Sequence, residues 1–149
     1  MKLRIHHFFD IIRDIGRGIE FTPHPYGHAN HKIAEMIRIG RDDKIELVMG
    51  CDDICTGCVH NIDSHCDDSI LYNRFQGKEK YNEHIDTRIM EVCGLKIHDV
   101  ITAEDLCRKG EIYANSMKQI YEYGDPEITK ERKLNFKKGM KVFLSGKQE

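Results

Sequence analysis

No part of the sequence is apolar for long enough to cross a membrane as a helix, which takes about 18 consecutive apolar residues. Residues 1–7 lack the apolar core of a signal peptide. We therefore expect a cytoplasmic protein with no membrane partner, in a compartment where thiols stay reduced. In that compartment, six cysteines indicate metal or redox chemistry more than a disulfide framework.

The sequence also lacks a strong net charge, an internal repeat and a low-complexity segment. Its formal net charge is −2 with the histidines neutral, which gives little attraction to nucleic acid, so we expect no nucleic-acid partner. At 149 residues, with 40% hydrophobic and 32% charged side chains, the chain fits a single globular domain over residues 1–149. A basic cluster near the C-terminus comprises Lys130, Arg132, Lys133, Lys137, Lys138 and Lys141. We interpret it as the solvated face of a basic amphipathic helix over residues 126–145.

Apolar spacing predicts an α+β, helix-rich fold of about five helices with two short strands. The strands are expected near residues 3–5 and 45–49. The helices are expected at about 7–16, 29–40, 81–94, 102–110 and 126–145, with a further short helix near 117–121. Residues 50–77 show no clear period, so we expect a long metal-binding cysteine loop there, ordered in part by the metal.

Cysteine is the most informative residue type in the sequence. Four of the six lie in one short stretch with the spacing C-x3-C-x2-C-x7-C, which offers soft thiolate ligands for zinc or for an iron–sulfur cluster. Structural zinc sites usually pair two C-x2-C units, and only one is present here, so we favour an iron–sulfur cluster, most readily [4Fe-4S], with zinc as the alternative. The expected ligands are Cys51, Cys55, Cys58 and Cys66. We interpret Cys93 and Cys107 as small buried side chains.

Nine histidines provide candidate acid–base residues and further ligands. His6 and His7 follow the first strand, and the cysteine loop follows the second, so parallel neighbouring strands would bring the two together at one edge of the sheet. The alternative is that these imidazoles fix the strand–helix turn. A candidate second metal or proton-transfer site, spaced H-x3-H-x2-H, comprises His24, His28 and His31. His60 and His65 lie inside the cysteine loop as alternative ligands or hydrogen-bond partners.

Two short motifs resemble a known family. Residues 3–7 read Leu-Arg-Ile-His-His, and Asp52-Asp53-Ile54-Cys55 is followed by Cys58 and later by the pair Ile85-Asp86. This pattern resembles Domain of Unknown Function 1284 over roughly residues 2–110. Its members are described as iron–sulfur-binding, so the resemblance implies a cluster but supplies no reaction.

The sequence departs from that family pattern at three positions. Members carry a cysteine where this chain has Asp10, usually lack one at the position of Cys51, and often have proline where this chain has Val59. One ligand has therefore moved, on this interpretation, from the first helix to Cys51.

Three functions remain open from the sequence. The first is a redox, electron-transfer or accessory module with a fully ligated cluster, which would need a redox partner protein. The second is a small enzyme with an open iron, acting on a small-molecule substrate with His6 or His7 as acid or base. The third is a zinc-stabilised interaction module. Four cysteines favour the first, because an open-iron site needs only three.

Overall fold

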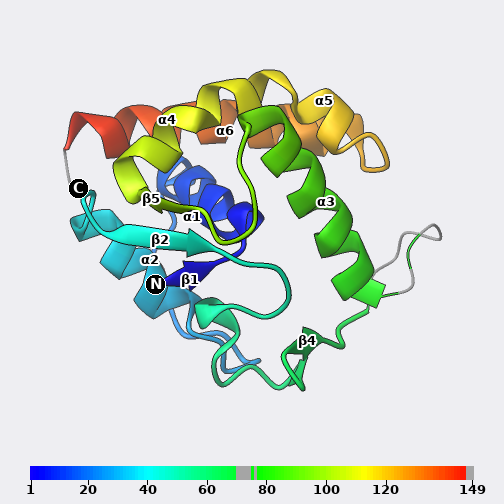
Figure 1. Ribbon diagram of the computed structural model, residues 1–149. Coiled ribbons are helices and arrows are strands. Elements are labelled where there is room, and N and C mark those ends of the chain that lie inside the picture. Colours follow the sequence, from blue (N-terminus) through cyan, green and yellow to red (C-terminus); the bar gives the residue numbers. More distant parts are fainter. Residues whose placement is uncertain (70–74, 76, 147–149) are drawn as a thin grey trace.

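The computed structural model describes residues 1–69, 75 and 77–146 and confirms the helix-rich α+β class (Figure 1). In these residues the helices are α1 (Ile5–Arg17), α2 (Asn30–Ile39), α3 (Gly77–Cys93), α4 (Ala103–Asn115), α5 (Met117–Ile120) and α6 (Pro126–Ser145), with a 3-10 turn, η1 (Asp53–Cys55). The strands are β1 (Lys2–Leu3), β2 (Lys44–Leu47), β3 (Asn61–Ile62), β4 (His65–Cys66) and β5 (Val100–Thr102). None of the helices described is both long and apolar enough to cross a bilayer.

The main sheet has the order β1-β2-β5, and its first two strands are parallel. Leu3 pairs with Leu47 across them, and both side chains are fully buried. Because parallel strands end on the same side, α1 and the cysteine loop leave the sheet next to each other, as the sequence predicted conditionally (Figure 1). The third strand, β5, runs antiparallel to β2 and was missed, since its three residues are too few to show a period.

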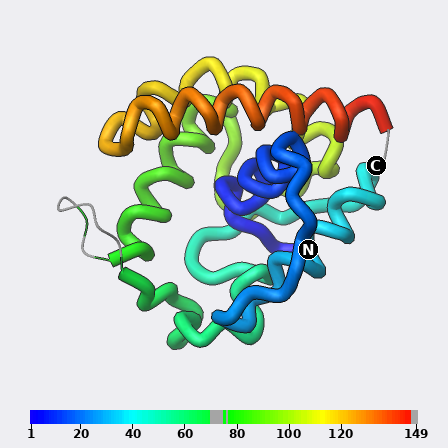
Figure 2. The backbone as a smooth tube through the Cα atoms, turned by 180° about the vertical axis from the view of Figure 1, so that it is seen from behind, coloured from blue at the N-terminus to red at the C-terminus, as the bar shows by residue number. Residues whose placement is uncertain are grey.

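Helices α1 and α6 pack backbone to backbone (Figure 2). A Cβ added to Gly16 would lie 1.8 Å from the carbonyl oxygen of Asn135, and one added to Gly139 would lie 1.8 Å from that of Ile12. Only glycine permits so close an approach. The crossing also brings Arg132 of α6 to Asp10 of α1, where they form an ion pair at 2.5 Å.

Two of the helices begin with a side-chain cap. The Thr102 side chain accepts a hydrogen bond from the Asp105 N–H, and Asp125 caps α6 with Pro126 in its first turn. The helix that was expected over 126–145 therefore has the bounds of α6. Its apolar face is buried, because Phe136 and Phe143 lie in the core.

Two helices extend past the glycines, Gly16 and Gly110, at which they were expected to end. The fourth helix runs through Gly110 to Asn115, and a Cβ at Gly110 would lie 2.5 Å from the Phe136 ring. Gly110 is therefore required for packing and does not end the helix. The first helix likewise passes Gly16 and is capped by Gly18, whose φ of 69° is left-handed.

Candidate metal centre

The cysteine loop is folded back on itself by a short hairpin. Strands β3 and β4 are joined by Asp63 and Ser64, which both have positive φ (49° and 65°), as a two-residue turn of this kind requires. The hairpin pairs Asn61 with Cys66, and the Ser64 carbonyl accepts the N–H of Cys51 at 2.9 Å. Cys66 thereby returns to the start of the loop, although the sequence offered no Asn-Gly or Asp-Gly signal for this turn.

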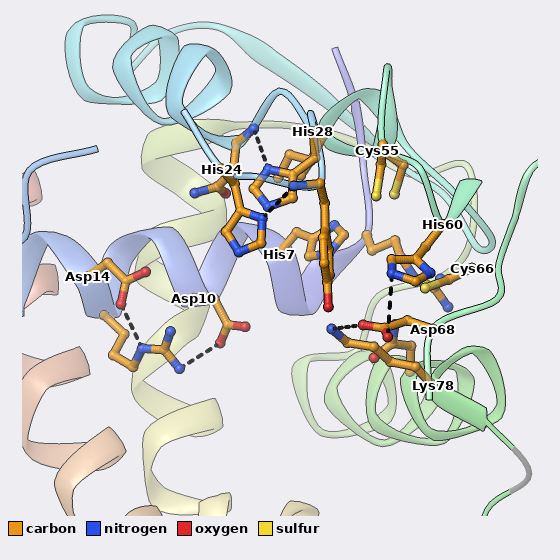
Figure 3. Close-up of a pocket in the computed structure, with 17 residues that line it drawn as sticks. His7, Asp10, Asp14, His24, His28, Cys55, His60, Cys66, Asp68 and Lys78 are labelled. Carbon is orange, nitrogen blue, oxygen red and sulfur yellow. Dashed lines mark hydrogen bonds and ion pairs between the residues drawn. The ribbon is translucent and has the colours of Figure 1, made fainter. Parts of the chain in front are cut away.

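Three of the four predicted ligands face one cavity. Cys55, Cys58 and Cys66 line a space of about 320 Å³ (Figure 3). The fourth, Cys51, lines a separate cavity of about 450 Å³, where the neighbouring Cys55 thiol partly offsets the effect of burial on its pKa. Three of the four predicted ligands therefore share one cavity, and the fourth lines another.

The thiols of this group are poorly ionised by themselves. Burial raises the pKa of Cys51, Cys55 and Cys66, and the neighbouring Asp52 carboxylate raises that of Cys55 further. Bound cations reverse this preference, because a coordinating thiol loses its proton. The donor set, soft sulfurs in a half-buried cavity, thus fits a soft metal centre.

A buried carboxylate connects the cysteines to the paired histidines. Asp52 Oδ2 accepts the Arg4 N–H at 2.7 Å and lies 2.8 Å from His7 Nδ1, whereas Oδ1 lies 3.4 Å from the Cys55 sulfur. Burial opposes ionisation of Asp52, but the His7 imidazole and the Arg4 N–H hold its pKa below the usual value. Potential ligand atoms of His7, Asp52 and Cys55 all lie within 4.8 Å of one another, which makes this trio a possible metal-binding group.

A second buried carboxylate, Asp86, binds Arg4 and His6 of the Leu-Arg-Ile-His-His segment. Asp86 Oδ2 accepts Arg4 Nε at 2.7 Å, and Oδ1 lies 2.6 Å from His6 Nδ1. Arg4 also pairs with Glu79 at 3.2 Å, and Glu79 accepts the Cys66 N–H at 3.0 Å. Arg4 and Asp86 are 1% and 0% exposed, so this network fixes α1, α3 and the cysteine loop relative to one another.

The two adjacent histidines therefore differ in position. His7 lines the cysteine cavity, whereas His6 is buried against Asp86 and does not line it. The partners of both rings are carboxylates.

The second histidine group is partly assembled. His24 and His28 line the same cavity with their rings stacked 4.5 Å apart. His31 does not line it, and its Nδ1 is buried without a hydrogen-bond partner among the described residues. Of the two loop histidines, His60 lines the cavity, whereas His65 is 70% exposed.

Several cavity residues were missed by the sequence analysis. Four of them, from four different segments, are Arg13, Tyr26, Asp68 and Lys78. Arg132 and Arg13 overcome the effect of burial on a further lining residue, Asp10, and lower its pKa to about 2. Charged residues that are scattered along the sequence form no motif, so the sequence did not indicate that they meet at one cavity. Cys93 and Cys107 are buried at 4% and 0% exposure, as expected of small core side chains.

A family model described as "Protein of unknown function (DUF1284)" matches residues 25–125. The chain belongs to this family. The DUF1284 match confirms the resemblance and includes the cysteine loop and Asp86. Residues 3–7 precede the matched range, but Arg4, His6 and His7 contact it through Asp52 and Asp86. No curated protein and no solved structure matches the chain.

Proposed function

We propose that this DUF1284 protein binds an iron–sulfur cluster, most readily [4Fe-4S], and serves as a redox, electron-transfer or accessory module. The observation that supports this best is that Cys55, Cys58 and Cys66 line one cavity. The proposed ligands are Cys51, Cys55, Cys58 and Cys66. When bound, a cluster would supply one-electron redox chemistry, to be exchanged with a partner protein.

The surrounding residues have defined tasks in this proposal. The backbone of Asp52 lowers the pKa of the Cys55 thiol, and the backbone of Asp68 lowers that of Cys66, which favours the thiolate forms that a metal needs. Glu79 fixes the backbone of Cys66, and the Arg4 guanidinium favours the thiolate of Cys51. These contacts hold the sulfurs in place and offset their negative charge.

Anaerobic purification provides the direct test of this function. The protein is expected to be brown and to contain iron and acid-labile sulfide in equal amounts, because thiolates in a reducing compartment take up such clusters. Iron and sulfide assays and the visible spectrum measure this. A colourless preparation with stoichiometric zinc, from iron-replete anaerobic expression, would favour the zinc-stabilised interaction module, since zinc is spectroscopically silent.

One observation favours a second function, an enzyme with an open iron. His7 lines the same cavity as three of the cysteines, and its Nδ1 is occupied by Asp52, which leaves Nε2 for a ligand. An imidazole oriented by a buried carboxylate is a common arrangement for a general acid or base. In this version Cys55, Cys58 and Cys66 hold the cluster, and a small molecule binds in the cavity.

Cys51→Ser separates the two functions. In the fully ligated module this variant should lose most of its iron, because one of four ligands is gone. In the open-iron enzyme it should retain iron and sulfide close to the wild-type level, since three cysteines suffice. Cys107→Ser, a buried change far from the loop in sequence, is the control and should keep its cluster in both cases.

A further inference from the structure

The loop that carries His24 and His28 is fixed directly to the cysteine loop. Val59 donates its N–H to the Tyr26 carbonyl at 2.8 Å, and Ala29 donates to Ile54 at 2.7 Å. Between these bonds, Gly27 and Gly57 meet backbone to backbone. A Cβ on either would lie 2.8 Å from the carbonyl oxygen of the other, and both have left-handed φ (77° and 80°). The histidine pair is therefore positioned relative to the cysteines by main-chain contacts.

Both imidazoles are held in one tautomer by the backbone. Tyr26 N–H donates to His24 Nδ1 at 3.1 Å, and Asn30 N–H donates to His28 Nδ1 at 3.4 Å. Because a backbone N–H can only donate, each Nδ1 must offer its lone pair, and the neutral ring then carries its proton on Nε2. Neither Nε2 has a hydrogen-bond partner among the residues that the structure describes.

This tautomer disfavours metal binding through Nε2. A metal requires a nitrogen lone pair, which the Nε2–H form lacks, and Nδ1 is already occupied. Burial and the neighbouring His24 ring also lower the pKa of His28, so that ring stays neutral near pH 7. The two rings therefore present hydrogen-bond donors to the cavity, where they lie side by side (Figure 3).

The remaining charges of the cavity are largely paired. On α1, Arg13 lies 3.4 Å from Asp10 and 3.0 Å from Asp14, and on the other side Lys78 lies 3.4 Å from Asp68. A ligand that enters this space thus meets neutralised carboxylates and two free N–H donors. Hydrogen-bond donors of this kind select oxygen acceptors.

We propose that His24 and His28 form a subsite for an oxyanion, a carboxylate or phosphate group of a small molecule that binds in the cavity lined by Cys55, Cys58 and Cys66. The subsite names the chemical class of ligand at the same site. Its biological role rests on the proposed function. The binding step itself needs only the two imidazoles and the loops that hold them.

The test uses metal-free, reduced full-length protein, titrated separately with inorganic phosphate and with acetate. Long-range ¹H–¹⁵N correlation spectra should show both rings in the Nε2–H tautomer, with shifts at Nε2 as one of the anions saturates the site. The anion that binds more tightly identifies the ligand group. His28→Phe, which keeps a ring but removes the donor, should weaken binding roughly tenfold.

Two further variants complete the test. His28→Gln, which restores a donor near the Nε2 position, should recover most of the affinity, and His98→Asn, at an exposed histidine outside the cavity, should leave it unchanged. Equal affinity in wild type and His28→Phe, or no saturable binding of either anion, would overturn the subsite. A switch of both rings to the Nδ1–H tautomer on adding Zn²⁺ would overturn it in favour of a metal site. Failure of the iron assay would leave all these results unaffected.

Discussion

Replacing Cys55 or Cys58 with serine is expected to abolish cluster binding and to open the cysteine loop. Amide protection over residues 50–68 should fall by about 100-fold or more, because metal ligation contributes folding free energy directly. Hydrogen exchange of the loaded protein, read by mass spectrometry, measures the change. The loop offers little to replace the metal, since Ile54 is its only residue among those described that belongs to the hydrophobic core.

Cys93→Ser is the matched control for that experiment. Cys93 is buried at the end of α3, and its thiol donates to the Lys109 carbonyl, a bond that a serine hydroxyl can also make. This variant should keep its metal and the protection of residues 50–68. If amide protection of the loop is equal in Cys58→Ser and Cys93→Ser, the hairpin and the main-chain bonds to residues 26–29 are sufficient to order the loop without a metal.

Asp86→Ala should destabilise the protein by about 3–5 kcal/mol, the usual cost of removing one partner of a buried ion pair. Asp86 is fully buried and receives hydrogen bonds from Arg4 Nε and from the His6 backbone N–H. Its removal leaves the Arg4 guanidinium, itself 1% exposed, with Glu79 as its remaining carboxylate partner among the described residues. The free energy of unfolding in urea measures the loss, and the m-value reports whether unfolding stays cooperative.

A double replacement distinguishes the ion pair from simple packing. Arg4→Met with Asp86→Leu removes both charges, so it should be more stable than Asp86→Ala alone, although Glu79 and His6 lose a partner as well. Asp42→Ala, at an exposed position, should change stability by no more than about 0.5 kcal/mol. A loss below about 1 kcal/mol in Asp86→Ala would show that water reaches Arg4 and that the network contributes little.

The elements that could be predicted from sequence are those with a local cause. The caps at Thr102 and Asp125 are formed by side chains that bond to the backbone two or three residues later. The buried strand residues Ile45 and Leu47 alternate with polar neighbours, as a strand requires. The helix ends expected at Gly16 and Gly110 were wrong, because a glycine that ends a helix and a glycine required for packing inside one look the same in sequence.

The candidate site was predicted only in part for a related reason. Its cysteines are close in sequence, so their spacing identified them as candidate metal ligands. The carboxylates that hold the paired histidines lie 45 and 80 residues away from them, at Asp52 and Asp86. A single sequence cannot show which of many acidic residues fills such a role. The tautomers of His24 and His28 depend on backbone N–H directions, which spacing does not encode.

The two partners of the Arg4–Asp86 ion pair are synthesised at different times, so the pair cannot form until residue 86 has left the ribosome. Arg4 leaves the ribosome 82 residues before its partner, a delay of about 4–16 s at ordinary rates of translation. The four loop cysteines emerge within that interval, as does Glu79, while α3 is still incomplete. A nascent chain therefore exposes the loop thiols before the buried carboxylate that anchors Arg4 exists. If the loop binds a metal as proposed, metal delivered in this interval would meet a chain that lacks the Arg4–Asp86 ion pair.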